Sequence, residues 1–164
     1  MSQIIIVPTA KDDVKTLLDI YNYYILHSTA TFQEKPIDEA EMSQLLFFEN
    51  PRHASFVIKK DGGVCGYCII SKHHIRSAYD RTGNLGIYIH PDFLRQGIGS
   101  IALDFINEWA RNHHYHALIA VICAENSGSI RLFESKGYFQ CAYLKEVGLK
   151  FGRVLDIVYH EKIL

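Results

Sequence analysis

The segment from Ile87 to Ser100 has the residue types best suited to bind a phosphate group. An apolar, β-rich run ends at Ile89, and apolar residues recur at helical spacing after Gly97 and Gly99. The first N–H groups of a helix lack partners inside it, and they carry the positive end of its dipole. Glycine lets a ligand approach that backbone without meeting a Cβ atom. The pattern therefore indicates either an anion-binding helix N-terminus or an ordinary strand-to-helix turn.

A second polar segment, 126–138, follows the buried apolar run 117–123. Asn126 is a typical helix N-cap, and Gly137 is typical of the position after a helix. Neither segment contains the P-loop or the full Gly-x-Gly-x-x-Gly motif of dinucleotide-binding folds.

Hydrophobic periodicity places these segments in an α/β fold. Strands are predicted over 3–7, 54–60, 64–71, 85–89, 117–123, 138–144 and 154–160. Helices are predicted over 14–25, 38–46, 97–109 and 129–136, with capping boxes at Thr9-x-x-Asp12 and Asp38-x-x-Glu41. We expect one mixed sheet flanked by about four helices, in a single domain that covers residues 1–164.

The two glycine-containing segments, in this order, resemble the Gcn5-related N-acetyltransferase (GNAT) superfamily. That family pairs [RQ]-x-x-G-x-[GA] after its fourth strand with an Asn-containing motif after its fifth. The chain also resembles the phosphinothricin acetyltransferase family in five further blocks, 20–24, 29–32, 78–79, 88–92 and 145–153. The similarity therefore spans nearly the whole chain.

This resemblance implies a sheet that splays between its fourth and fifth strands, with acetyl-CoA in the gap. It implies that the backbone of Ile87, Tyr88 and Ile89 pairs with the pantetheine arm, and that Asn126 hydrogen-bonds that arm. The pyrophosphate would be held by the N–H groups of Arg95, Gln96, Gly97, Ile98, Gly99 and Ser100. Leu94 replaces the family's Arg or Gln, and we expect a modest loss because these contacts are main-chain contacts.

The implied reaction is the attack of a neutral amine on a thioester, which requires removal of a proton from the amine. Relatives carry a glutamate as the base where this chain has Asn84, and an amide cannot usefully accept a proton near pH 7. Phe133 likewise replaces a family His or Tyr. The sequence leaves three substitutes open in the polar stretch 72–83, namely His73, His74 and Asp80.

The acceptor side also departs from the family, since His73-His74 replaces a frequent Trp-Arg pair. Arg76 and Tyr79 match the family pattern, and Lys150 and Arg153 lie in the matched C-terminal block. Those two cations either face an anionic acceptor or merely flank a hairpin turn. The predicted acceptor-binding residues are His74, Arg76, Tyr79 and Lys150.

Composition argues against several other classes of protein. The 164 residues include 17 Lys+Arg and 18 Asp+Glu, which is no basic footprint for nucleic acid. The longest wholly apolar run, 117–124, is far shorter than the roughly 20 residues of a membrane helix, and the first residues lack a signal-peptide pattern. We expect a cytoplasmic protein without nucleic-acid or membrane partners.

Neither the cysteines nor the histidines predict a metal site. Cys65 and Cys68 lie in a predicted strand, where residues three apart point to opposite faces, so we interpret both as buried apolar residues. The cluster 113–116 contains three histidines near a helix C-terminus, where the dipole favours them. No cysteine or carboxylate completes a ligand set at metal spacing.

The sequence therefore predicts an N-acetyltransferase that uses acetyl-CoA and acetylates a small amino-acid-like amine, of the phosphinothricin or methionine sulfoximine type. A non-catalytic acyl-CoA-binding module is the alternative, because Asn84 and Phe133 remove the customary proton-handling groups. Acetylation of protein N-termini or lysines is a third option, which the match at 21–32 disfavours. Family members commonly form homodimers, so a homodimer is a further expectation.

Overall fold

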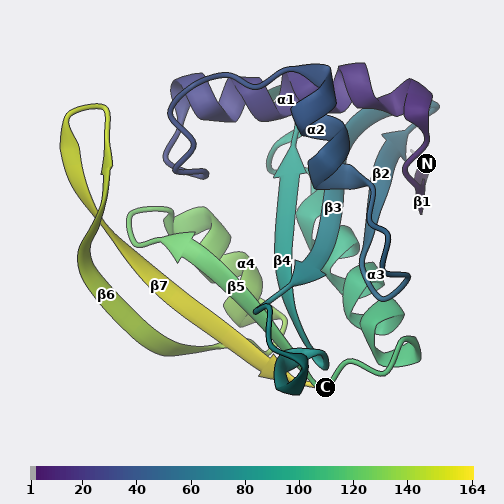
Figure 1. Cartoon of the computed structure of the whole chain (residues 1–164). Helices are drawn as coiled ribbons and strands as arrows, with labels where there is room; N and C mark the ends of the chain where they lie inside the picture. Colours follow the sequence, from purple (N-terminus) through teal and green to yellow (C-terminus); the bar gives the residue numbers. More distant parts are fainter. Residues whose placement is uncertain (1–2) are drawn as a thin grey trace.

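The computed structural model describes residues 3–164, which form a seven-stranded mixed sheet with the order β1-β2-β3-β4-β5-β7-β6 (Figure 1). The strands are β1 (Ile4–Pro8), β2 (Ala54–Lys60), β3 (Gly63–Lys72), β4 (Thr82–Ile89), β5 (Ala117–Cys123), β6 (Phe139–Lys150) and β7 (Arg153–Ile163). The pairing of β4 with β5 is parallel, and the other neighbouring pairs are antiparallel. The order of helices and strands is the one predicted from the sequence.

Four α-helices cover the two faces of this sheet: α1 (Val14–His27), α2 (Glu39–Leu46), α3 (Ile98–Asn112) and α4 (Ser127–Ser135). Helices α1 and α2 pack on one face in a cluster that contains Leu17, Met42 and Tyr67. Helices α3 and α4 pack on the opposite face, where Ile106 and Phe133 belong to a second cluster (Figure 1). Within residues 3–164, no helix combines the length and apolar character needed to cross a bilayer.

The alternation of side chains along β4 decides which residues meet which helices. Ile87 and Ile89 pack in the cluster beneath α3, whereas Tyr88 packs against α1. Because side chains alternate with a period of two, Asn84 shares the α1 face with Tyr88. The strand is longer than the predicted 85–89, since it begins at Thr82, and Asn84 therefore lies within it.

Strands β4 and β5 are paired only over a short stretch. Their ladder joins 82–84 to 117–119, and it ends with the pair Asn84 and Ile119. Beyond that pair, β5 continues to pair with β7 as far as Cys123, while this edge of β4 has no strand partner among the described residues. The predicted splay between the fourth and fifth strands is confirmed.

The capping box predicted at Thr9 and Asp12 was wrong by one residue. The Ala10 N–H donates to Asp13 Oδ2 at 2.9 Å, and the chain enters α1 through the short 3-10 helix η1 (Lys11–Asp13). Asp13 is the carboxylate that turns inward, and its Oδ1 atom lies 3.5 Å from Lys59 Nζ. The second predicted box is confirmed, since Asp38 and Glu41 exchange hydrogen bonds of 2.9 Å.

Cys65 and Cys68 share one face of β3, contrary to the predicted opposite faces. Ile58 pairs with Gly66 and Lys59 with Val64, so that Cys65 is the additional residue of a β-bulge. The bulge shifts the alternation by one residue. Both thiols are free and belong to the same apolar cluster, which confirms their interpretation as buried apolar residues.

The hairpin of β6 and β7 is longer than predicted and extends away from the rest of the sheet (Figure 1). Gly148 does not end β6, because the strand continues through it to Lys150. The pairing with β7 is irregular between Leu144 and Gly148, where β6 has more residues than β7. A Cβ atom at Gly148 would lie 2.2 Å from Phe32. The hairpin therefore packs closely against the loop that follows α1.

Candidate active site

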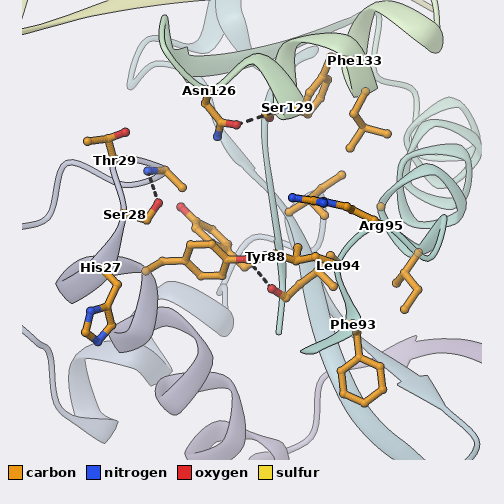
Figure 2. A pocket seen from close by; sticks show the side chains of 18 of the residues that line it. His27, Ser28, Thr29, Tyr88, Phe93, Leu94, Arg95, Asn126, Ser129 and Phe133 are labelled. Carbon is orange, nitrogen blue, oxygen red and sulfur yellow. Dashed lines mark hydrogen bonds between the residues drawn. The ribbon is translucent and has the colours of Figure 1, made fainter. Parts of the chain in front are cut away.

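A cleft of about 960 Å³ opens where β4 and β5 separate (Figure 2). Its walls are the end of α1 with the following loop, strand β4, the turn before α3 and the start of α4. A smaller hollow of about 80 Å³ continues between 85–88 of β4 and 120–122 of β5. The predicted cofactor residues line the cleft except Gln96, whose side chain instead binds the Asp92 carbonyl at 3.1 Å.

The turn before α3 presents six consecutive N–H groups, from Arg95 to Ser100, that have no acceptor among residues 3–164. The first intrahelical hydrogen bond of this turn is donated by Ile101 to the Gly97 carbonyl, at 3.2 Å. These groups lie at the positive end of a 15-residue helix. The Arg95 side chain also extends into the cleft (Figure 2). The arrangement suits a phosphate or pyrophosphate group.

Glycine is needed at positions 97 and 99 for different structural reasons. Gly97 has φ +77°, in the left-handed region, and a Cβ atom there would meet nothing within 4 Å. At Gly99 a Cβ atom would lie 3.0 Å from Leu132 Cδ2. The backbone turn therefore requires Gly97, whereas Gly99 lets α3 approach α4, a reason beyond the predicted access for a ligand.

The free edge of β4 presents backbone groups of Ile87 and Ile89, but not of Tyr88. The His90 N–H donates to the Cys65 carbonyl at 2.8 Å, which makes Ile89 a non-hydrogen-bonded position of the β3–β4 ladder. The N–H and C=O groups of Ile87 and Ile89 therefore point away from β3, and those of Tyr88 point toward it. This corrects the predicted backbone role of Tyr88, which contributes its side chain to the cleft.

Tyr24 of α1 covers part of this free edge. Its hydroxyl donates to the Ile89 carbonyl, and its ring packs edge-on against Tyr88 at 5.6 Å. Burial raises the pKa of Tyr24 to about 12, so the hydroxyl stays a donor at neutral pH. Since the Ile89 carbonyl is already bonded, Ile87 offers the free carbonyl on this edge.

Asn126 caps α4 and lines the cleft at the same time. Its Oδ1 accepts a hydrogen bond of 3.1 Å from the Ser129 N–H, which confirms the predicted cap (Figure 2). Its Nδ2 group remains able to donate to a ligand. Phe133 is buried, lines the same cleft and packs edge-on against Tyr138 at 5.0 Å. At the family's His or Tyr position, the structure therefore presents an apolar wall.

The predicted acceptor residues His74, Arg76 and Tyr79 lie together at the short 3-10 helix η2 (Ser77–Tyr79). The rings of His74 and Tyr79 are 4.8 Å apart, and Arg76 Nη1 lies 3.5 Å from His74 Nε2. None of the three lines the large cleft. They form a separate cluster just before β4.

His73 connects that cluster to the end of the β4–β5 ladder. Its Nδ1 lies 2.9 Å from Asn84 Oδ1, and its ring packs against Tyr79 at 5.8 Å. Asn84 stands where the two strands separate, so His73 links the acceptor cluster to that point of the sheet. The structure thus brings the predicted acceptor residues together, apart from Lys150.

Comparison with known proteins matches residues 17–138 to the profile of the family described as "Acetyltransferase (GNAT) family". The chain belongs to the GNAT acetyltransferase family. A phosphinothricin N-acetyltransferase from Alcaligenes faecalis is 32% identical over 158 residues, which is 93% of this chain and 79% of the relative.

Solved GNAT structures confirm the fold. A phosphinothricin acetyltransferase from Sinorhizobium meliloti, in complex with acetyl-CoA, superposes with a TM-score of 0.91 at 27% identity, covering 98% of this chain and 88% of that one. A ribosomal-protein-alanine N-acetyltransferase from Brucella melitensis gives a TM-score of 0.92 at 32% identity, covering 98% and 99%. The predicted fold, a GNAT sheet splayed between strands β4 and β5, is confirmed.

Lys150 lies in a different place from the one predicted for an acceptor-binding residue. Its side chain is 2% exposed, and its ammonium donates to the carbonyls of Ser28 (2.8 Å) and Thr31 (2.7 Å). Burial lowers the pKa of this ammonium. Lys150 therefore anchors the loop after α1 to β6, and no hydrogen bond within residues 3–164 connects it to the acceptor cluster.

The GNAT motifs gave no sign that this loop forms a wall of the cleft. His27, Ser28 and Thr29 face the turn before α3 across the cleft (Figure 2). Thr29 Oγ1 donates to Glu125 at 2.8 Å, and Arg153 forms two bonds of 3.0 and 2.9 Å with that carboxylate. Arg153 thus joins the mouth of the cleft. A polar loop has no periodicity from which these contacts could be predicted.

Among residues 3–164, the structure contains no group of three or more His, Cys, Asp or Glu side chains placed to hold a metal ion. His113 of the predicted non-metal cluster stacks on Trp109 at 3.7 Å, at the end of α3.

Proposed function

We propose that this chain is an N-acetyltransferase that transfers the acetyl group of acetyl-CoA to the primary amine of a small amino-acid-like acceptor. The observation that carries this proposal is the run of six free N–H groups at 95–100, beside the free edge of β4. A helix N-terminus binds anions, and a free strand edge binds an extended chain. These groups suit the pyrophosphate and the pantetheine arm of acetyl-CoA, with the thioester directed to the narrow end of the gap.

We assign roles to individual residues from their positions in the site. The backbone of 95–100 holds the pyrophosphate, Ile87 and Asn126 bind the pantetheine arm, and Arg76 attracts a carboxylate of the acceptor. An acceptor of the phosphinothricin type is supported by the name of the Alcaligenes faecalis relative and by the exposed cation of Arg76. We expect the enzyme to act in the cytoplasm.

A non-catalytic acyl-CoA-binding module is the second candidate, and it is favoured by Asn84 and Phe133. Neither side chain can accept a proton from an amine near pH 7. A protein N-terminus is the second acceptor class to consider, because the Brucella melitensis structure is named for an alanine of a ribosomal protein.

A thiol-release assay with acetyl-CoA and a panel of amines tests the proposal. The panel contains L-methionine sulfoximine, phosphinothricin, common L-amino acids, Nα-blocked lysine and a peptide with an N-terminal alanine. We expect thiol release above background hydrolysis with at least one free α-amino acid, together with its N-acetyl product by mass spectrometry. Thiol release with the peptide alone would indicate that the enzyme acetylates protein N-termini. Saturable binding of acetyl-CoA without thiol release for any amine would support the non-catalytic acyl-CoA-binding module instead.

A further inference from the structure

We propose that His73, rather than the residue at position 84, takes the proton from the acceptor amine. This assignment rests on the proposed function. Asn84 replaces the family's glutamate, and the structure places an imidazole directly beside that amide, with His73 Nδ1 2.9 Å from Asn84 Oδ1. A group that can accept a proton is therefore present beside position 84, on a neighbouring residue.

The hydrogen bond determines which nitrogen of the imidazole is basic. The Asn84 Oδ1 atom can only accept, so His73 Nδ1 carries the proton and donates it. The lone pair then lies on His73 Nε2, which has no hydrogen-bond partner among the described residues. The ring of Tyr79 packs edge-on against the imidazole, with the ring centres 5.8 Å apart. A neutral, oriented imidazole is the side chain best able to accept a proton near neutral pH.

The position of this pair in the sheet places it at the reacting end of the gap. Asn84 forms the last pair of the β4–β5 ladder, and the hollow between the strands begins with the next residue, Leu85. His73 directly follows β3, in which Ser71 pairs with Asn84. The pair of His73 and Asn84 therefore lies where the two strands separate, one residue before the hollow that we expect the thioester to reach.

The two other candidate bases face different partners. Both ring nitrogens of His74 face Arg76, at 3.3 Å from its backbone N–H and 3.5 Å from its Nη1 atom. The Asp80 carbonyl accepts a hydrogen bond of 3.2 Å from Arg52 Nη1, and burial lowers the pKa of His53, which the charge of Asp80 raises. Only His73 of the three hydrogen-bonds to Asn84 within residues 3–164.

The step balances in atoms and charge. His73 Nε2 accepts one proton from the acceptor ammonium and releases it to solvent. The neutral nitrogen bonds to the acetyl carbon, the carbon–sulfur bond breaks, and the second proton lost by the nitrogen ends on the sulfur. The products are the N-acetyl acceptor, the free thiol of CoA and one proton in solution.

The test combines His73→Gln with restoration of the family carboxylate. Glutamine keeps the size and polarity of the imidazole but cannot accept a proton, so we expect kcat to fall about 10²- to 10⁴-fold. The Kd for acetyl-CoA, measured by calorimetry, should stay within about twofold because the pyrophosphate turn is untouched. His113→Gln, at the far end of α3, is the matched control and should keep the wild-type kcat.

Adding Asn84→Glu to His73→Gln places a carboxylate where the family has its base. We expect this double variant to recover at least about tenfold of the lost kcat, because the carboxylate restores a proton acceptor beside the reacting amine. A kcat of His73→Gln within about threefold of wild type, or no recovery in the double variant, would overturn the assignment. A wild-type protein that releases no thiol with any amine would instead overturn the proposed function itself, and the assignment with it.

Discussion

The two sides of the gap between β4 and β5 present different kinds of chemical group. The cofactor side presents main-chain groups, at 95–100 and at Ile87, which every residue type except proline supplies. The acceptor side presents side chains, with His73, Asn84 and Arg76 as its polar groups. A substitution leaves the first kind of site intact unless it moves the backbone, whereas each change of side chain in the second kind alters the chemistry. A departure on the acceptor side therefore requires compensation by a neighbouring residue.

The largest effect on the cofactor side is expected from Gly97→Val. A β-branched residue at φ +77° is strained by about 1–3 kcal/mol, and the turn can relieve the strain only by moving its N–H groups. We expect the Kd for acetyl-CoA to rise about 10- to 100-fold in calorimetry. Gly62→Val is the matched control, because Gly62 has φ +87° with equally open surroundings in the turn between β2 and β3. Equal losses of affinity in both variants would show that strain alone, and not the turn before α3, is responsible.

On the acceptor side, Arg76→Met removes an exposed cation from the cluster at η2. A charge-assisted contact with a carboxylate contributes about 1.5–3 kcal/mol, and solvent screening reduces it at an exposed site. We expect the KM for a carboxylate-bearing acceptor to rise about tenfold, with the Kd for acetyl-CoA unchanged. Arg111→Met, near the end of α3, controls for the loss of one positive charge. An unchanged KM would remove Arg76 from the acceptor site.

Lys150→Met distinguishes anchoring of the loop from acceptor binding. The substitution leaves the Ser28 and Thr31 carbonyls without their donor, at a cost of about 1–3 kcal/mol in the free energy of unfolding. We expect the melting temperature to fall by about 2–4 °C for each kcal/mol lost. Scanning calorimetry measures this change. A raised acceptor KM with an unchanged melting temperature would instead support the role predicted from the sequence.

The smallest effect is expected from Leu94→Arg, which restores the residue type that the GNAT pattern has at this position. Leu94 lines the cleft and is 48% exposed, while the neighbouring turn presents its N–H groups to the cleft. We expect the Kd for acetyl-CoA to change by less than about threefold, or about 0.7 kcal/mol. A gain of tenfold or more would mean that side chains contribute strongly on the cofactor side too.

Periodicity and capping signals were sufficient for the order of helices and strands, because those signals are local to each element. The splay followed from the family resemblance, and the ladder that ends at Asn84 confirms it. Tyr88 was misassigned because the direction of a backbone group depends on the phase of the β3–β4 ladder, which a single strand sequence does not contain. The bulge at Cys65 could not be predicted for the same reason, since it exists only in the pairing with β2.

Contacts between distant segments were the part of the site that could not be predicted. Lys150 meets the Ser28 carbonyl 122 positions earlier in the chain, and Glu125 joins Thr29 to Arg153. The contact between His73 and Asn84 is different, because both residues were already singled out from the sequence. What the structure adds there is the 2.9 Å distance on which we base the choice of one of three candidate bases.

Amide chemical-shift mapping during two separate titrations tests the division of the site most directly. Acetyl-CoA is added to one sample of the ¹⁵N-labelled wild-type protein and the best acceptor of the amine panel to a second sample, so that no acetyl transfer takes place. We predict that acetyl-CoA shifts the amides of 95–100, Ile87 and 126–129, and that the acceptor shifts those of 73–84. Acetyl-CoA shifts that avoid 95–100, or acceptor shifts that avoid 73–84, would contradict the account.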